Sequence, residues 1–360
     1  GIGLPIGISF FTFQTMSYSI DLYRKEVKPE KNYLTYLTYV SMFPQLIAGP
    51  IVRFSTVQQE LHSRTIDREG FYNGGIRFLQ GLFKKVLIAN NMGAMWELIR
   101  ALPLAEVSVA TAWLGALAFT LQLYFDFSAY SDMAIGMGHM LGFHYLENFN
   151  YQLYAISITD FWRRWHISLS SWLRDYIYVP LGGNRKGFGR KCINTIIVFA
   201  VCGIWHGAGM HFVVWGLLHG VYSLIDSMIR RKGWKMPFGK FVTFLEVSFA
   251  WIFFRADSLR QALGYIYHMV TAGIRTEQIQ SVSETLGLTM SEIIIIILGI
   301  ILVCFVDELC NRKHTNFSFL IQQRQNAFRY AVFYLLLVAI FIFGIYGSGY
   351  QTEQFIYMQF

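Results

Sequence analysis

The sequence predicts an all-α, polytopic integral membrane protein, and three observations support this prediction. First, 54% of the 360 residues are hydrophobic and only 14% are charged, whereas soluble proteins carry about 25% charged residues. Second, the mean hydropathy is +0.39. Third, the apolar residues form long charge-free runs, without the alternating ~10-residue strands of a membrane barrel. We expect one integral membrane domain over residues 1–360.

Long apolar runs mark the expected spanning helices, because about 20 such residues cross the hydrocarbon core. Residues 192–225 contain no Asp, Glu, Lys or Arg, and the isoleucine-rich residues 293–306 are expected to face lipid. The first run lacks a basic leader and a cleavage site, so we expect a chain that starts inside a longer protein and not a signal peptide. The aromatic residues 354–360 are expected to dock at the membrane interface. The other long apolar runs in which spanning helices are expected are residues 1–20, 32–52, 107–125 and 330–352.

Two of these segments carry residues that are unusual inside a membrane. Pro44 and Pro50 interrupt the second run, and a broken helix at membrane depth needs protein or water to satisfy its freed backbone groups. We therefore expect a re-entrant segment there. Asp126 and Asp132 follow the third run. Carboxylates at such positions usually face a polar interior, although a loop at the membrane interface would explain them equally well.

Basic residues gather at the ends of apolar runs and give the chain a net charge of +8. By the positive-inside rule, their loops are expected to be cytoplasmic. A docking surface for an acidic partner or for lipid headgroups is the alternative. The three groups are Arg24, Lys25, Lys28 and Lys31; Arg185, Lys186, Arg190 and Lys191; and Arg230, Arg231, Lys232, Lys235 and Lys240.

His206 falls in an expected turn between two helices. Residues 192–205 climb about 21 Å at about 1.5 Å per residue, short of the ~30 Å core, so His206 is expected to lie within the hydrocarbon. Gly207 and Gly209 are expected to adopt backbone conformations that other residues resist and to let substrate approach the imidazole. An ionisable residue at this depth is a candidate for function; a hydrogen-bonded packing histidine is the alternative.

An amphipathic segment with three tryptophans and three arginines precedes this turn. At helical spacing, Trp162 and His166 share one face of residues 160–176, and Trp165 lies on another. The segment is expected to be an interfacial helix anchored by its aromatic side chains. His166 is a catalytic candidate because it could pair with the deeper imidazole of His206.

The four cysteines lie in or beside apolar segments without CxxC spacing, so neither a disulfide framework nor a metal site is expected. Cys202 precedes His206 by four residues, which leaves a covalent cysteine mechanism as an alternative. His211 and His219 are expected to be structural or to line a channel. His206 and His211 lack the i, i+4 spacing of a helical metal-ligand pair.

Two long motifs are the most specific feature of the sequence: FWRRWHISLSSWLRDYIYVPLGGNRKG at residues 161–187 and GIWHGAGMHFVVWGLLHG at residues 203–220. They resemble the hallmark segments of the membrane-bound O-acyltransferase family, and the YVPLGGNR stretch is similar to the alginate O-acetylation branch rather than to the D-alanyl-transferring branch. The first few helices of relatives have no counterpart here. Residues 209–211 and His139 depart from relatives and could affect the choice of acceptor. Shorter similar stretches are residues 4–24, 43–54, 124–138 and 355–360.

The resemblance implies a helical fold with re-entrant segments around a tunnel, where an acyl donor from the cytoplasm meets a hydroxyl acceptor from outside. It assigns His206 as the principal catalytic histidine and His166 as the second active-site position. Transfer of an acetyl group from a thioester to an alcohol needs a base for the hydroxyl and a stabilised oxyanion. We expect His206 to be the base and His166 to orient substrate or stabilise the oxyanion. Candidate substrate-binding residues are Trp165, Trp205, Arg174, Asp175 and Asn184.

The leading hypothesis is therefore a multi-pass O-acetyltransferase of the bacterial inner membrane. It is expected to need no bound cofactor or metal and to take acetyl-CoA or an acyl carrier protein as its thioester donor. Its acceptor would be an exported or cell-surface polysaccharide, acetylated directly or through a periplasmic or extracellular acetyltransferase partner, and not a nucleic acid. A transporter or flippase with a histidine and aspartate proton relay is the main alternative, and an acyltransferase for a lipid or protein is the other.

Overall fold

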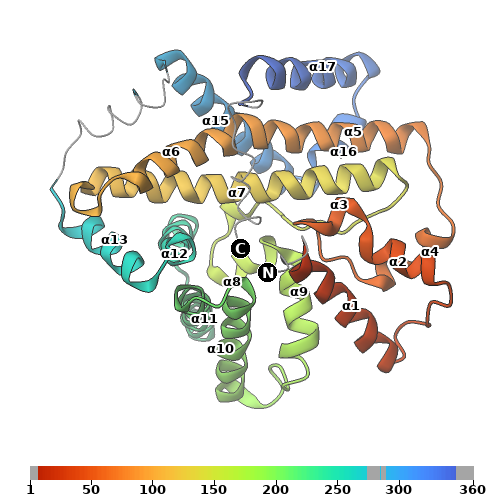
Figure 1. The fold of residues 1–360 in the computed structure, drawn as a ribbon, viewed down its shortest axis with the longest axis horizontal. Helices are drawn as coiled ribbons and strands as arrows, with labels where there is room; N and C mark the ends of the chain where they lie inside the picture. The colour runs from red at the N-terminus through yellow and green to blue at the C-terminus, as the bar shows by residue number, and fades with distance from the viewer. Residues whose placement is uncertain (1–6, 274–283, 285–288, 346–360) are drawn as a thin grey trace, which may run out of the picture.

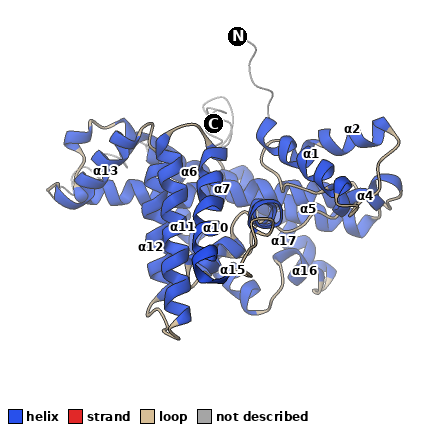
Figure 2. Cartoon of the chain, turned by 90° about the horizontal axis from the view of Figure 1, so that it is seen from below, coloured by secondary structure: helices blue, strands red, loops and turns tan. Residues whose placement is uncertain are grey.

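A computed structural model describes residues 7–273, 284 and 289–345, and every regular element in these ranges is helical (Figure 2). The predicted all-α class is therefore confirmed. The expectations for residues 1–6 and 354–360 lie outside the described residues. In chain order the elements are α1 (Ile8–Tyr23), α2 (Tyr33–Ser41), α3 (Phe43–Leu46), α4 (Phe54–His62), α5 (Arg68–Phe83), η1 (Lys84–Ala89), α6 (Asn90–Ala101), η2 (Leu104–Glu106), α7 (Val109–Met140), η3 (Gln152–Tyr154), α8 (Ile158–Arg164), α9 (Ile167–Leu173), η4 (Arg174–Tyr178), α10 (Gly187–His206), α11 (Met210–Arg231), α12 (Gly239–Arg255), α13 (Leu259–Thr271), α15 (Met290–Arg312), α16 (Phe317–Gln322) and α17 (Asn326–Phe343).

Within the described ranges, four helices are long and apolar enough to cross a membrane: α10, α11, α15 and α17. They confirm the spanning helices predicted in residues 192–225 and 293–306 and in the described part of 330–352. The described residues of the runs 1–20, 32–52 and 107–125 contain no helix that meets this criterion, so the prediction of spanning helices there is not confirmed. On α15, Ile297 and Ile301 are exposed, as expected of a surface that faces lipid. This protein is thus an integral membrane protein.

The second apolar run is broken, as its prolines predict. The helical conformation is interrupted at Met42, where ψ is 109°, and α3 ends at Leu46, ahead of Pro50. Buried Gln45 donates from its side-chain amide to the carbonyl oxygen of Tyr39 at 2.8 Å. That hydrogen bond satisfies one of the backbone groups freed by the break, which is the condition for an interrupted helix in an apolar environment.

Helices α5, η1 and α6 follow one another without a loop and run alongside α7 (Figure 1). The segment η1 is π-helical, with one residue more per turn than an α-helix. Its lysines reach two buried carboxylates of α7: Lys84 lies 3.0 Å from Asp132 and Lys85 lies 2.6 Å from Asp126. Both aspartates therefore face a polar interior inside a helix, and the alternative of a surface loop is wrong.

Helices α10 and α11 form a tightly packed antiparallel pair that ends at His206. A Cβ atom on Gly216 would lie 2.2 Å from the carbonyl oxygen of Phe199, and one on Gly203 would lie 2.4 Å from that of Phe212. Such contacts are too short for any side chain, so these glycines allow the two backbones to approach closely. In Figure 1 this pair and α12 run below the layer formed by α5, α6 and α7.

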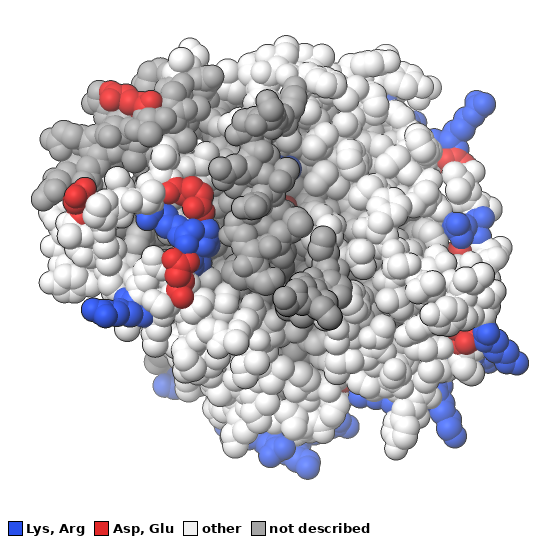
Figure 3. Space-filling view, viewed as in Figure 1, with Lys and Arg blue, Asp and Glu red and all other residues white. Residues whose placement is uncertain are grey.

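The second and third basic groups lie at the same end of the α10 and α11 pair. The guanidinium of Arg231 stacks 4.9 Å above the ring of Phe188, and Lys191 donates a hydrogen bond to Ser227. In the space-filling view, basic side chains project at the lower and right-hand margins, others lie beside acidic side chains at the left, and the described atoms between the centre and the right-hand margin are mostly uncharged (Figure 3).

Candidate active site

His206 is the last residue of α10 and is buried where α10, α11 and α12 meet. Its ring centroid lies 4.7 Å from that of Trp205, 5.0 Å from that of Trp215 and 5.1 Å from that of Phe254. All three rings contact the imidazole edge-on. The imidazole is therefore enclosed by aromatic side chains of three different helices.

The geometry corrects one expectation about the turn after His206 and leaves another untested. Helix α10 begins at Gly187 and includes Arg190 and Lys191, so it is longer than the charge-free run used to predict the depth of His206, and that depth stays a prediction. Gly207 is extended (φ 163°, ψ 161°) and Gly209 has φ −71°, so neither needs an unusual backbone conformation. Gly207 is needed for its small size, because a Cβ atom at this position would lie 2.4 Å from the ring of Phe212.

His166 lies at a break between α8 and α9, which corrects the expected continuous helix over residues 160–176. Its backbone is left-handed (φ 45°, ψ 54°), a conformation that costs energy in a residue other than glycine. Asn148 causes the break by replacing helical hydrogen bonds. Its backbone carbonyl accepts from the amide of Ile167 at 2.9 Å, and its side-chain oxygen accepts from the amide of Ser168 at 3.0 Å.

The imidazole of His166 is buried. Its Nδ1 lies 3.4 Å from Oδ1 of Asn148, and its ring contacts Phe127 edge-on at 4.7 Å. Burial, together with the nearby imidazole of His206, lowers the pKa of His166 well below its usual value. Its Nε2 is buried as well and has no hydrogen-bond partner among the described residues.

The two histidines share the indole of Trp205 as a neighbour. Its ring centroid lies 4.7 Å from that of His206 and 6.3 Å from that of His166. Phe10 of α1 also contacts Trp205 at 5.7 Å and His166 at 6.3 Å. The structure thus brings together the two histidines named from the sequence, from segments 40 residues apart, in one aromatic cluster.

Trp165 and the two other histidines take packing positions. Trp165 is buried against Trp251 of α12, with ring centroids 5.5 Å apart. His219 accepts a hydrogen bond at Nδ1 from the indole of Trp162 at 3.2 Å, and Nδ1 of His211 lies 3.1 Å from the carbonyl oxygen of Phe253. These contacts fit the structural role expected for His211 and His219.

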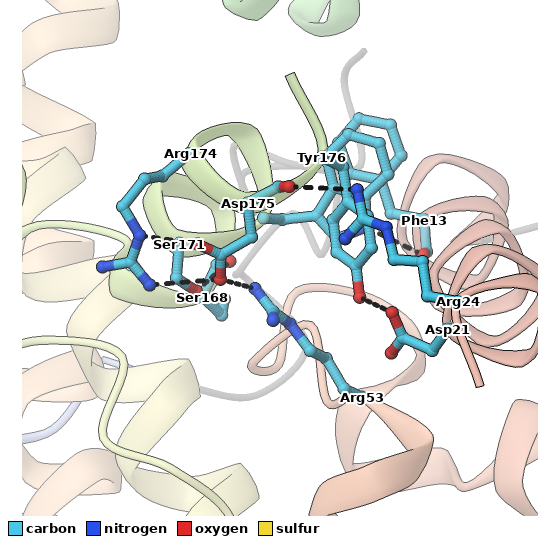
Figure 4. Close-up of polar contacts among 10 residues, drawn as sticks. Phe13, Asp21, Arg24, Arg53, Ser168, Ser171, Arg174, Asp175 and Tyr176 are labelled. Carbon is cyan, nitrogen blue, oxygen red and sulfur yellow. Dashed lines mark hydrogen bonds and ion pairs between the residues drawn. The ribbon is translucent and has the colours of Figure 1, made fainter. Parts of the chain in front are cut away.

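Arg174 and Asp175 belong to a separate ionic cluster on η4 (Figure 4). Arg53 lies 2.8 Å and Arg174 lies 2.7 Å from the carboxylate of Asp175. Burial would raise the pKa of Asp175, but the hydrogen bonds from Arg174 and Arg53 outweigh it and hold that pKa below its usual value. Asn184 is exposed and accepts a hydrogen bond from Tyr178.

A stack of aromatic rings connects this ionic cluster with the histidines. Arg53 lies 5.0 Å above the ring of Tyr176, and Tyr176 contacts Trp172 at 4.9 Å. Trp172 stacks on Phe13 at 3.9 Å, and Phe13 stacks on Trp205 at 5.3 Å. Three of the predicted substrate-binding residues, Arg174, Asp175 and Trp205, are therefore connected by a series of side-chain contacts. The intervening side chains were not predicted as site residues from the sequence.

Two polar residues of this region were missed from the sequence. Asn148 accepts hydrogen bonds from the backbone next to His166. It lies in a loop 18 positions before His166, and no motif in the sequence around it indicates this role. Gln14 is completely buried beside Phe13, and neither of its side-chain amide atoms has a partner among the described residues. An amide within an otherwise apolar run was a signal that could have identified Gln14.

Cys202 lies one helical turn before His206 and is completely buried in the hydrophobic core. Small apolar side chains and thiols pack well at such positions. Its position is that of a packing residue between α10 and its neighbours.

Comparisons with known proteins identify the family of this chain. The family model of the membrane-bound O-acyltransferase family matches residues 10–260. The chain is 45% identical over 262 residues to the probable alginate O-acetylase AlgI of Pseudomonas fluorescens, covering 72% of this chain and 52% of that protein. It is 39% identical over 302 residues to the peptidoglycan O-acetyltransferase of Helicobacter pylori, covering 74% and 57%.

A more distant match is the teichoic acid D-alanyltransferase of Bacillus subtilis, 26% identical over 257 residues, covering 67% of this chain and 64% of that protein. The chain spans about half the length of the alginate O-acetylases that it matches. The matched region contains both histidines, the aromatic cluster and the ionic cluster on η4. This chain therefore belongs to the membrane-bound O-acyltransferase family.

Proposed function

We propose that this protein transfers an acetyl group from a thioester donor to hydroxyl groups of a polysaccharide. The observation that carries the proposal is the burial of His206 and His166 around one shared indole, Trp205. Relatives named as acetylases of alginate and of peptidoglycan support a polysaccharide acceptor. For an exported or cell-surface polysaccharide, the proposal places the enzyme in the bacterial cytoplasmic membrane, with transfer direct or relayed through an extracytoplasmic acetyltransferase.

In the proposed reaction, His206 removes the proton from the acceptor hydroxyl. The oxygen attacks the carbonyl carbon of the thioester, a C–O bond forms and the C–S bond breaks. The thiolate leaves and takes the proton back from His206, so the residue is regenerated and no net proton is consumed. Nδ1 of His166 faces the amide oxygen of Asn148, so the unpartnered Nε2 of the neutral ring orients the acceptor by accepting a hydrogen bond from its hydroxyl.

One nitrogen atom supports an oxyanion site near the histidines. The indole Nε1–H of Trp205, whose ring neighbours both imidazoles, has no partner among the described residues. A buried donor without a partner costs about 1–3 kcal/mol. In the proposed reaction this N–H donates to the oxyanion that develops on the thioester carbonyl.

Radiolabelled acetyl-CoA and an acceptor glycan in proteoliposomes test the proposal. His206→Ala is expected to abolish acetyl transfer while the protein still inserts and folds. His314→Ala, at an exposed histidine, is the matched control and should leave transfer unchanged. Uptake of substrate without acylation would instead favour the transporter alternative. Undiminished transfer by His206→Ala would contradict the assigned base.

A further inference from the structure

A small cavity lies where the end of α6, the end of α12 and the start of α13 meet. It has a volume of about 140 Å³. Its lining includes Trp96 and Arg100 of α6, Arg255 of α12 and Tyr265 of α13. None of the candidate site residues described above lines it, so this cavity is separate from the aromatic cluster around the histidines.

The cavity lies at the end of the helices that is opposite to the basic groups. Helix α12 ends beside the start of α11, since Nδ1 of His211 lies 3.1 Å from the carbonyl oxygen of Phe253, and the third basic group follows the other end of α11. The next residue, Phe254, contacts His206, and Arg255 after it lines the cavity. Because the basic loops are expected to be cytoplasmic, the cavity opens on the side from which an exported polysaccharide arrives.

Two buried aromatic side chains line the cavity, and one of them has an unpartnered donor. The ring centroids of Trp96 and Tyr265 lie 5.9 Å apart. Tyr265 donates its hydroxyl to the carbonyl oxygen of Ala112 at 2.8 Å, whereas the indole Nε1–H of Trp96 has no partner among the described residues. A buried N–H without an acceptor is costly, and an oxygen atom of a ligand in the cavity would satisfy it.

Planar polar side chains complete the lining. Arg255 lies 2.6 Å from Glu97, and Arg100 lies 2.6 Å from Asp257. Because each guanidinium is paired with a carboxylate, the cavity presents N–H donors with little net charge. Gln261 accepts at Oε1 from the backbone amide of Asp257 at 2.6 Å, and within the described ranges its amide nitrogen donates to no protein group. This lining suits a ligand that carries hydroxyl groups rather than a strong charge.

We propose that this cavity is an outer subsite that holds one sugar residue of the polysaccharide acceptor. A sugar ring packs its apolar C–H face on aromatic side chains and pairs its hydroxyl groups with planar polar side chains. The cavity volume equals roughly five molecules of liquid water, which suits one ring and excludes a longer segment of glycan. A fatty acyl chain would leave the indole N–H of Trp96 and the amide of Gln261 unpartnered.

The subsite lies beside the reaction centre and not in it. Successive residues of a helix are rotated by about 100°, so Phe254 and Arg255 face different sides of α12. The sugar that is acetylated would lie at His206, and another residue of the same polymer would lie in the cavity. This inference rests on the proposed function and adds a place where the polymer is held.

Binding of alginate oligosaccharides and of peptidoglycan glycan fragments to the purified protein in lipid nanodiscs tests the subsite. Long fragments should bind more tightly than disaccharides, because only a long fragment reaches both His206 and the cavity. Trp96→Phe keeps a ring and removes the N–H, and it is expected to weaken binding of the long fragment about three- to tenfold, the loss of one hydrogen bond. Trp113→Phe, at a tryptophan of α7 outside the cavity, is the control and should bind as the natural protein does.

A second variant fills the cavity without removing a polar group. Ala256 lines the cavity, and Ala256→Leu is expected to weaken binding of the long fragment tenfold or more while the melting temperature and the binding of a disaccharide stay unchanged. Ala272→Leu is the matched control. Ala272 follows α13 with nearly the same backbone angles (φ −68°, ψ 154°) as Ala256 after α12 (φ −65°, ψ 147°), and it lies outside the cavity.

The dependence on fragment length separates this inference from the proposed function. Unchanged binding of the long fragment in both variants would overturn the subsite, and so would equal losses for short and long fragments or a natural protein that binds neither glycan. Length-dependent binding that is lost in Ala256→Leu, in a natural protein that transfers no acetyl group, would support the subsite and contradict the proposed function.

Discussion

Phe13 and Trp172 stack face to face, with ring centroids 3.9 Å apart and planes inclined by only 3°. The indole of Trp172 also donates to the carbonyl oxygen of Phe13 at 3.0 Å (Figure 4). Two independent interactions therefore fix α1 against α9. Because Phe13 stacks on Trp205 as well, this contact supports the aromatic neighbour that both histidines share.

Removing the indole should destabilise the protein. Trp172→Ala leaves a cavity in the core and is expected to cost about 3–5 kcal/mol of unfolding free energy, whereas Trp172→Phe retains a ring and is expected to cost about 1 kcal/mol, the lost hydrogen bond. Thermal unfolding in detergent measures both. Trp234→Ala, at an exposed tryptophan, is the control, and an equal melting temperature for Trp172→Ala and the natural protein would contradict the assigned packing.

Asp175 should contribute a pH-dependent stability. Its pKa in the folded protein lies below the usual value because hydrogen bonds from Arg174 and Arg53 outweigh the opposing effect of burial. Its contribution is therefore complete above about pH 4, the unfolded pKa, and is lost as the pH falls through the folded pKa. Asp175→Asn should lower the melting temperature at pH 7, and the difference from the natural protein should shrink as the pH falls below about 4.

The control for this pH series is Glu26→Gln, at an exposed carboxylate that makes no ion pair in the described ranges. It should follow the natural protein at every pH. A melting temperature of Asp175→Asn equal to that of the natural protein at pH 7 would show that the two arginines do not stabilise the fold through Asp175.

Because α10 and α11 pack closely, adding one methyl group at Gly216 should lower both stability and acetyl transfer. Gly216→Ala would place a Cβ atom 2.2 Å from the carbonyl oxygen of Phe199, so the helices must separate. Overpacking of this kind costs about 1–3 kcal/mol, and the shift at the end of α10 should reduce acetyl transfer. Gly299→Ala on α15 has nothing within 4 Å of the added Cβ and should be neutral in thermal unfolding and in transfer.

Asn148 is expected to act as a positioning residue for His166. Asn148→Leu removes the oxygen that accepts from the amide and hydroxyl of Ser168, so the strained backbone at His166 should relax. We expect kcat to fall about tenfold or more while KM for the donor changes little. Asn150→Ala, two residues on, is the control. A rise in KM at unchanged kcat would instead assign Asn148 to substrate binding.

Cys202→Ala decides between the two chemical routes. Since Cys202 is buried in the core, the variant is expected to lose some stability and to retain acetyl transfer within about twofold. Steady-state transfer and capture of an acetylated intermediate by mass spectrometry check this. Abolished transfer in a protein that still inserts normally would favour a cysteine nucleophile.

The sequence predicted those features that depend on local composition. The apolar run of α15 and the break near Pro44 follow from side chains that are adjacent in the chain. The pairing of Asp126 and Asp132 with lysines of η1 was expected only as burial in a polar interior. The lysine partners could not be named, because they lie 41 and 48 residues away in the chain.

The candidate site was less accessible to sequence reasoning. His206 and His166 were identified from their motifs, but the helix assigned around His166 was wrong because Asn148 captures its backbone hydrogen bonds. Periodicity cannot show such a competitor when it lies in a distant loop. The depth of His206 stays a prediction, because α10 includes Arg190 and Lys191 and the charge-free run used in the argument is only part of that helix.

The π-helical segment η1 has a consequence for the whole first half of the molecule. Successive residues of an α-helix are rotated by about 100°, and a π turn absorbs one additional residue without a loop. Deleting a single residue between Lys84 and Ala89 would leave a regular helix, but it would rotate α6 by about that angle relative to α5. Trp96 would turn away from Phe119, which it now contacts. The additional residue in η1 thus determines which face of α6 packs against α7. The ion pairs of Lys84 and Lys85 with α7 stabilise that orientation.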